Sequence, residues 1–249
     1  GRLRHLITLQ GLERSHISGM LDRAVKLREA FSASGSRPQL LAARTVVNLF
    51  FEPSTRTRSS FELAARRLGA NVLNFDISGS STSKGESLED TLATLEAMQA
   101  DAFIVRHKEN GTPERLARHA QRAAILNAGD GNHAHPTQGL LDGYTALRAL
   151  GDLTGRKIVM VGDIVHSRVA RSTSRIFGLL GAEVVWVAPS TLLPSDCSPF
   201  DVRVSNSFDD ELADADICYV LRIQSERISE ALFPSVDEYQ DRFGYTTHR

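Results

Sequence analysis

Residues 45–62 read TVVNLFFEPSTRTRSSFE, and this stretch decides the fold. Residues 45–51 are nearly all apolar and either β-branched or aromatic, which predicts a strand buried on both faces. Apolar residues then recur at helical spacing from Phe61 to Leu68. Residues 54–58 therefore lie where a strand passes into a helix. Free backbone N–H groups and the positive end of the helix dipole favour an anion there, so we expect a phosphate-binding segment.

That segment also has a plainer interpretation. Ser and Thr are common helix caps, and Arg is common on an exposed first turn. The phosphate hypothesis gains weight only if other segments bring matching side chains to the same edge of the fold.

The composition is that of a globular protein with room for two domains, with 249 residues, 41% of them hydrophobic and 24% charged. Lys and Arg number 29 and Asp and Glu 30, for a formal net charge of -1. This balance gives no general positive field for nucleic acid or an acidic membrane, so we expect neither as a partner. Any anion must be bound by locally placed Arg and Lys side chains.

Cys197 and Cys218 form neither a CxxC pair nor a zinc-binding spacing. Idle thiols are typical of a reducing cytosol. No apolar run reaches membrane-span length and the first residues show no signal-peptide pattern, so we expect a cytoplasmic protein.

Strand-like and helix-like runs alternate along the chain. The expected strands are residues 45–51, 71–75, 101–105, 123–127, 156–161, 183–187 and 215–221. The expected helices are residues 57–68, 88–99, 113–121, 137–150 and 167–180. The pattern breaks at residues 151–155. It predicts an α/β protein with two α/β/α domains, residues 1–150 and 151–249, each built on a mainly parallel sheet.

Polar side chains follow several of these strands. In open parallel sheets, ligands lie outside the carboxyl ends of the strands, which favours a site role for Arg106 after the strand at 101–105. Residues 78–87 form a polar loop with glycines, hydroxyls and Lys84. That loop could approach a ligand closely or be an ordinary surface loop.

Residues 129–138 place His135 and Gln138 at the entrance of the long helix. His133 and His135 alternate in a loop without a third ligand at a convincing spacing, which argues against a metal. A histidine that donates a hydrogen bond to a carbonyl oxygen is the better interpretation of His135.

In the second half, Ser167 can cap a helix, which puts Arg168 in its first turn. A cation there opposes the helix dipole, and an anionic ligand would explain its presence. Arg222 and Gln224 similarly lie at the end of the strand at 215–221.

Together these segments resemble a known family. Residues 54–58 and 135–138 are similar to the carbamoyl-phosphate signature of the transcarbamoylases. Ser80 with residues 84–86, residues 162–172 and residues 222–227 resemble the aspartate branch, as found in bacterial aspartate carbamoyltransferase catalytic chains. The resemblance spans nearly the whole sequence in the expected order.

The resemblance implies an enzyme that transfers the carbamoyl group of carbamoyl phosphate to the α-amino group of L-aspartate. The products would be N-carbamoyl-L-aspartate and phosphate, in pyrimidine biosynthesis. Catalysis would rest on positioning and electrostatics, without a covalent intermediate, metal or cofactor.

The resemblance also implies roles for single residues. The phosphate would be surrounded by Ser54, Thr55, Arg56, Thr57 and Arg106. The carbonyl oxygen would be stabilised by Thr57, Arg106 and His135, and the carbamoyl NH2 would be held by Gln138. The aspartate carboxylates would be bound by Arg168, Arg222, Gln224 and Lys84.

Ser80 and Lys84 would enter the site of a neighbouring subunit. The active unit would then be a homotrimer with shared sites, which regulatory or other pathway chains could join.

Two alternatives stay open. An ornithine-type carbamoyltransferase would share the phosphate half, but Arg222 and Lys84 would repel its cationic substrate. Chains of the family continue to a His-Pro-Gly-Pro loop and C-terminal helices, whereas this sequence ends at Arg249. We therefore expect a second domain without its C-terminal part, and a non-catalytic truncated homologue is the other alternative.

Overall fold

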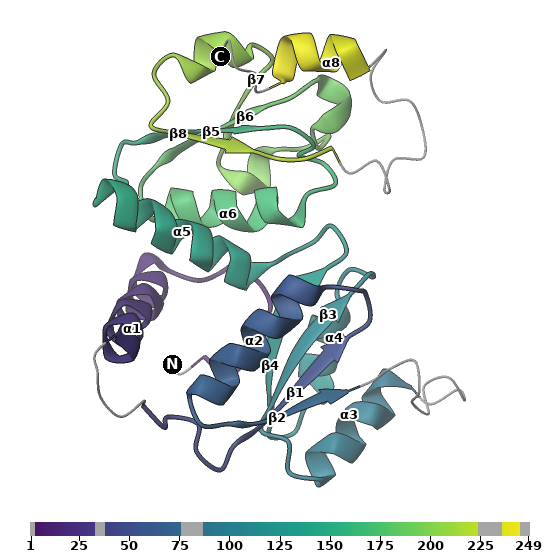
Figure 1. The fold of residues 1–249 in the computed structure, drawn as a ribbon. Coiled ribbons are helices and arrows are strands. Elements are labelled where there is room, and N and C mark those ends of the chain that lie inside the picture. Colours follow the sequence, from purple (N-terminus) through teal and green to yellow (C-terminus); the bar gives the residue numbers. More distant parts are fainter. Residues whose placement is uncertain (1–2, 33–37, 76–86, 224–235, 245–249) are drawn as a thin grey trace. The chain divides into compact units, whose positions relative to one another are not determined.

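The computed structural model describes residues 3–32, 38–75, 87–223 and 236–244. The chain forms two compact units. The first comprises Gly1–Leu9 and Ser18–Thr137, and the second comprises Gln10–Ile17 and Gln138–Arg249. Each unit has its own four-stranded parallel sheet (Figure 1).

The first sheet has the strand order β2-β1-β3-β4, and every pair is parallel. Its strands are β1 (Thr45–Phe50), β2 (Asn71–Phe75), β3 (Ala102–His107) and β4 (Ala124–Asp130). The connecting helices are α2 (Thr55–Arg67), α3 (Leu88–Ala97) and α4 (Thr112–His119), and α1 (Arg14–Ser32) precedes them in the chain.

Successive residues of β1 enter two different hydrophobic cores. Val47 packs in one cluster with Leu92 of α3 and Leu116 of α4. Its neighbour Val46 packs in another cluster with Ala65 of α2. Because successive side chains of a strand point to opposite faces, these two clusters lie on opposite faces of the sheet. Helices cover both faces (Figure 1), which explains why the sequence of β1 is almost continuously apolar.

The second sheet has the order β7-β6-β5-β8, again all parallel. Its strands are β5 (Lys157–Val161), β6 (Glu183–Val187), β7 (Arg203–Ser205) and β8 (Ile217–Val220). The helices of this half are α5 (Pro136–Leu150), α6 (Arg168–Leu179), α7 (Phe208–Leu212) and α8 (Val236–Phe243), with short 3-10 turns at Ser190–Leu192 and Ser198–Phe200.

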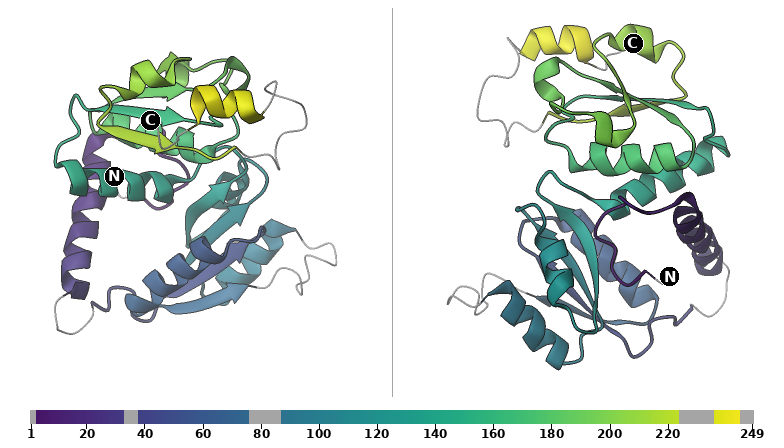
Figure 2. Two further views of the ribbon diagram at one scale, coloured as in Figure 1. Left: turned by 45° about the horizontal axis from the view of Figure 1, so that its top comes forward. Right: turned by 180° about the vertical axis from the view of Figure 1, so that it is seen from behind.

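Helices cover both faces of this sheet as well (Figure 2). Phe208 of α7 and Phe243 of α8 pack with Val159 of β5 in one core. On the other face, the indole N–H of the fully buried Trp186 donates to Ser174 Oγ of α6, with 2.8 Å between nitrogen and oxygen.

The predicted fold class is confirmed. All seven expected strands are present, and the five expected helices begin and end within two residues of their predicted bounds. α1, β7, α7 and α8 were not predicted. The division of the chain falls at the start of α5, between Thr137 and Gln138.

Candidate functional site

The carboxyl ends of β1, β3 and β4 are neighbours in the first sheet. Phe50 of β1 lies opposite Arg106 of β3, and the Phe51 N–H donates to the Arg106 carbonyl oxygen at 2.9 Å. The Gly131 N–H, just after β4, donates to the His107 carbonyl oxygen at 3.0 Å. Residues 54–58, Arg106 and the loop that carries His135 therefore lie at the carboxyl end of the first sheet, as the sequence predicts.

The amino end of α2 is open toward an anion. Ser54 is the N-cap residue, yet its side chain makes no capping hydrogen bond, and the first turn contains no acidic residue. Thr55 and Arg56 are exposed and Thr57 is partly buried. Uncapped N–H groups and the helix dipole make this turn a favourable place for a phosphate.

Arg106 is held from two sides. Its Nε lies 2.8 Å from Glu52 Oε1, in an ion pair whose side chains are 15% and 21% exposed. Its Nη1 donates to the Ala128 carbonyl oxygen at 3.3 Å and lies 3.5 Å from Thr57 Oγ1. The guanidinium is therefore oriented beside the first turn of α2. Glu52 was missed by the sequence interpretation, although it stands two residues before Ser54.

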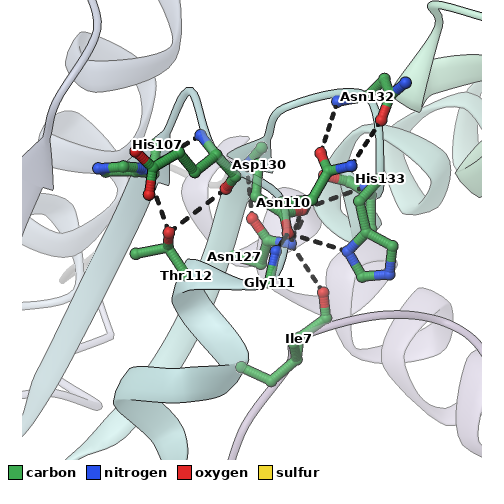
Figure 3. A network of polar contacts seen from close by, with 12 residues as sticks. Ile7, His107, Asn110, Gly111, Thr112, Asn127, Asp130, Asn132 and His133 are labelled. Carbon is green, nitrogen blue, oxygen red and sulfur yellow. Dashed lines mark hydrogen bonds and ion pairs between the residues drawn. The ribbon is translucent and has the colours of Figure 1, made fainter.

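The loop that carries His135 is organised by Asp130, a fully buried carboxylate at the end of β4 (Figure 3). Oδ2 accepts hydrogen bonds from the Gly111 N–H at 2.7 Å and from His133 Nδ1 at 2.9 Å. Oδ1 accepts from Asn127 Nδ2 at 2.8 Å and from the Ala134 N–H at 3.1 Å. Four donors on one carboxylate fix the turn that leads directly to His135.

The charge of Asp130 suits this role. Burial alone would raise its pKa, but hydrogen bonds from His133, Asn127 and Gly111 stabilise the carboxylate and lower its pKa overall. A second pair, Asn110 Nδ2 to Asn132 Oδ1 at 2.7 Å, ties the start of α4 to the same loop (Figure 3).

His135 itself is buried, with 7% of its surface exposed. Its Nδ1 lies 3.4 Å from Thr137 Oγ1 in the first turn of α5. His133 instead bonds to Asp130, so the two histidines of the loop have different partners. In the described part of the chain, no group of three or more His, Cys, Asp or Glu residues is arranged to hold a metal ion.

In the second unit, candidate site residues likewise follow the carboxyl ends of two neighbouring parallel strands, β5 and β8. Gly162 follows β5 with φ +129°, and a Cβ there would lie 2.3 Å from the carbonyl oxygen of Leu221 after β8. Only glycine lets the two strand ends approach so closely. Because Arg168 follows β5 and Arg222 follows β8, both arginines leave the second sheet from adjacent strands.

Arg168 begins α6 and is buried, whereas Arg222 is exposed. Ser167 caps α6, as predicted, by accepting a hydrogen bond from the Ala170 N–H at 3.1 Å. Before it, the fully buried Asp163 accepts from His166 Nδ1 at 2.9 Å and braces the turn. The sequence did not predict this pairing.

Gln138 stands in the first turn of α5 and belongs to the second unit. Its Nε2 donates to Asp142 Oδ1 at 2.9 Å. The predicted site residues Ser80, Lys84 and Gln224 lie outside the described residues. The structure thus brings Thr57 and Arg106 together and places His135 at the same end of the first sheet. In the other unit, Arg168 and Arg222 follow two adjacent strands.

None of the described helices is both long and apolar enough to cross a bilayer.

The chain matches the family "Aspartate/ornithine carbamoyltransferase, carbamoyl-P binding domain" over residues 4–148. It is 50% identical to the aspartate carbamoyltransferase catalytic subunit of Frankia casuarinae, covering 99% of this chain and 77% of that protein. It is 51% identical to the aspartate carbamoyltransferase catalytic subunit of Xanthomonas campestris pv. campestris, covering 100% of this chain and 80% of that protein.

Solved structures agree with these relatives. Aspartate transcarbamoylase from Trypanosoma cruzi, in complex with carbamoyl phosphate and aspartate, has a TM-score of 0.83 and 32% identity, over 91% of this chain and 74% of that one. The catalytic subunit of M. jannaschii aspartate transcarbamoylase has a TM-score of 0.82 and 36% identity, over 96% and 79%. With the fold, the order of the motifs and these relatives in agreement, the chain belongs to the aspartate/ornithine carbamoyltransferase family, among the aspartate carbamoyltransferase catalytic subunits.

Proposed function

We propose that this chain transfers the carbamoyl group of carbamoyl phosphate to the α-amino group of L-aspartate. The observation that carries the proposal is the position of Arg106. Glu52 and the Ala128 carbonyl hold its guanidinium 3.5 Å from Thr57, at the uncapped amino end of α2. A fixed cation, a hydroxyl and free N–H groups together favour a phosphate with a polarised carbonyl attached.

The first unit would bind carbamoyl phosphate. Ser54, Thr55 and Arg56 would contact the phosphate together with Thr57 and Arg106. The carbonyl oxygen would accept hydrogen bonds from Thr57, Arg106 and His135, and each such donor typically stabilises the transition state by about 3–4 kcal/mol. Residues 1–150 would accordingly form the carbamoyl-phosphate domain.

The predicted second domain, residues 151–249, would bind aspartate. Arg168 and Arg222 would each pair with one carboxylate, since the planar guanidinium matches that group better than an ammonium does. The free amine would attack the carbonyl carbon, the C–O bond to phosphate would break, and phosphate would leave. The departing phosphate is a candidate acceptor for the amine proton.

The ligands of the solved relatives support this reaction. Trypanosoma cruzi aspartate transcarbamoylase is described with carbamoyl phosphate and aspartate, with carbamoyl aspartate and phosphate, and with N-(phosphonacetyl)-L-aspartic acid. The relatives at about half identity carry the aspartate name. Both lines favour aspartate over ornithine as the acceptor.

The direct test is a transfer assay on the chain with carbamoyl phosphate and either L-aspartate or L-ornithine. We expect carbamoyl aspartate with aspartate and no product with ornithine. Transfer to ornithine alone would establish the ornithine-type alternative. Absence of transfer to both amines, by a folded chain, would support the non-catalytic alternative.

The proposal includes a homotrimer with shared sites, to which Ser80 and Lys84 of one subunit contribute in the next. The relatives are named catalytic subunits, which agrees with an assembly. Mixing inactive Lys84→Ala and Arg106→Ala chains would form some sites free of both changes, so activity should return. Mixed trimers without activity would contradict the sharing of sites between subunits.

A cytoplasmic location completes the proposal, and free thiols at Cys197 and Cys218 agree with it.

A further inference from the structure

Asp142 lies one helical turn beyond Gln138 on α5 and makes three side-chain hydrogen bonds. Oδ1 accepts from Gln138 Nε2 at 2.9 Å. Oδ2 accepts from Thr173 Oγ1 at 2.6 Å and from the Tyr219 hydroxyl at 3.0 Å. These partners come from α5, α6 and β8, all in the second unit. No part of the proposed reaction described so far uses this carboxylate.

Close packing of α5 on α6 creates the network. Gly143 follows Asp142, and a Cβ at Gly143 would lie 2.4 Å from Ile176 Cγ2 of α6. The absence of that Cβ lets α5 approach α6 until Asp142 meets the fully buried hydroxyl of Thr173. The carboxylate is therefore held by Thr173 and Tyr219, two residues outside α5.

The chemistry of a carboxylate then decides how the Gln138 amide is turned. Burial raises the pKa of Asp142, whereas the hydrogen bonds from Thr173, Gln138 and Tyr219 favour its ionised form. An ionised carboxylate has acceptors only, so the amide presents its NH2 to Asp142, as the contact from Gln138 Nε2 shows. Thr173 and Tyr219 are both able to donate, which leaves no partner that requires a proton on Asp142. Tyr219 stays a neutral donor because burial, and then the negative charge of Asp142, raise its pKa.

Fixing the NH2 group leaves the side-chain oxygen Oε1 of Gln138 as the group available to a ligand. Among the described residues, no hydrogen-bond donor contacts this oxygen. A hydrogen-bond acceptor at this position matches an NH2 group of a ligand and repels a carbonyl or carboxylate oxygen. The carbamoyl group carries such an NH2, whereas an acetyl group of the same shape carries a methyl in its place.

We propose that Asp142 is a positioning residue that holds Gln138 as a hydrogen-bond acceptor and so sets the preference for a carbamoyl over an acetyl group. This inference rests on the proposed function and adds the residue that sets its donor specificity. Asp142 would act only through Gln138. Its replacement should therefore affect substrates that carry the NH2 group and spare those that do not.

The test compares carbamoyl phosphate with acetyl phosphate as donors to L-aspartate. In Asp142→Asn the new amide can pair with Gln138 in either direction, so Gln138 can turn its NH2 toward the ligand. We expect kcat/KM with carbamoyl phosphate to fall about tenfold or more while kcat/KM with acetyl phosphate changes little. Tyr219→Phe keeps the carboxylate and removes one of its supports, so it should lower the preference by a smaller factor.

Asp216→Asn is the matched control, because Asp216 also accepts hydrogen bonds, from Arg156 and the Lys157 N–H, but at the opposite end of the second sheet. It should leave the ratio of the two kcat/KM values unchanged. An equal loss with both donors in Asp142→Asn and in Tyr219→Phe would overturn the inference and leave the proposed function standing. A folded wild-type chain that transfers neither group would overturn both.

Discussion

The guanidinium Nε of Arg106 lies 2.8 Å from Glu52 Oε1, with both side chains largely shielded from water. Glu52 follows β1 and Arg106 is the residue before the last of β3, so the pair joins two neighbouring strand ends. The ion pair orients Arg106 without any ligand, which reduces the cost of ordering it when a phosphate binds. Arg106 is thus oriented for its proposed role by a residue outside the predicted phosphate-binding segment 54–58.

Arg106→Lys tests whether this fixed geometry matters. Lysine keeps the charge but cannot make the contacts to Glu52, Ala128 and Thr57 with one planar group. We expect kcat/KM for carbamoyl phosphate to fall about 100-fold, the usual loss for one such donor. Arg67→Lys on the exposed end of α2 is the control and should be neutral. A fully active Arg106→Lys enzyme would show that charge alone suffices.

Arg56→Ala should separate activity from stability. Arg56 is exposed in the first turn of α2, and within the described residues its guanidinium makes no hydrogen bond or ion pair. The free energy of unfolding should therefore change by less than about 0.5 kcal/mol. Activity should fall about 1000-fold if Arg56 binds the phosphate. Urea titration measures the unfolding free energy and initial rates measure the activity. A wild-type rate in Arg56→Ala would show that Arg56 does not bind the phosphate.

The regular elements were predictable where burial leaves a pattern in the sequence. β1 and β5 are buried on both faces and read as apolar runs, and α6 begins one residue after its capping Ser167. β7 has three residues and two of them are exposed, so no such pattern exists. Arg203 holds it to α7 through Glu211, a contact between side chains eight residues apart. Local sequence does not reveal that pairing.

The site was predictable in part for the same reason. The position of Arg106 and His135 at the carboxyl end of the first sheet was predictable, because polar residues that follow parallel strands gather there. The i, i+4 spacing of Gln138 and Asp142 is visible in the sequence once a helix is assumed. Their partners Thr173 of α6 and Tyr219 of β8 are distant along the chain and meet Asp142 only in the folded unit, where α5 packs closely on α6. Supporting residues of this kind require the folded structure.

Gly162→Ala should damage the second unit at the ends of β5 and β8. The position has φ +129°, which side chains rarely adopt, and its new methyl would meet the Leu221 carbonyl. Backbone strain of this kind costs about 1–3 kcal/mol. We also expect a raised KM for aspartate, because Arg168 and Arg222 follow these two strands. Gly178→Ala, inside α6 with open space around it, is the control and should be neutral or stabilising. A Gly162→Ala enzyme with wild-type stability would contradict the close approach.

Glu211 makes the stability of the second unit depend on pH. Hydrogen bonds from Arg203 at 2.6 and 2.7 Å and from Lys157 outweigh the effect of burial and lower its pKa to about 2, from 4.5. An unfolded glutamate takes up a proton near pH 4.5, whereas the folded chain resists protonation until about pH 2. The carboxylate therefore stabilises the fold fully above pH 4.5, and this contribution is lost as the pH falls toward 2.

Glu211→Gln should remove that dependence together with the stabilisation. At pH 7 the variant should lose about 2 kcal/mol, the scale of hydrogen bonds to a charged group. Between pH 5 and 2 the unfolding free energy of the wild type should fall more steeply than that of the variant. Glu183→Gln is the control, since Glu183 bonds to Arg203 from an exposed position and should matter by less than about 1 kcal/mol. Urea titrations at several pH values measure both slopes, and parallel curves for wild type and Glu211→Gln would show that the folded chain does not hold this carboxylate ionised.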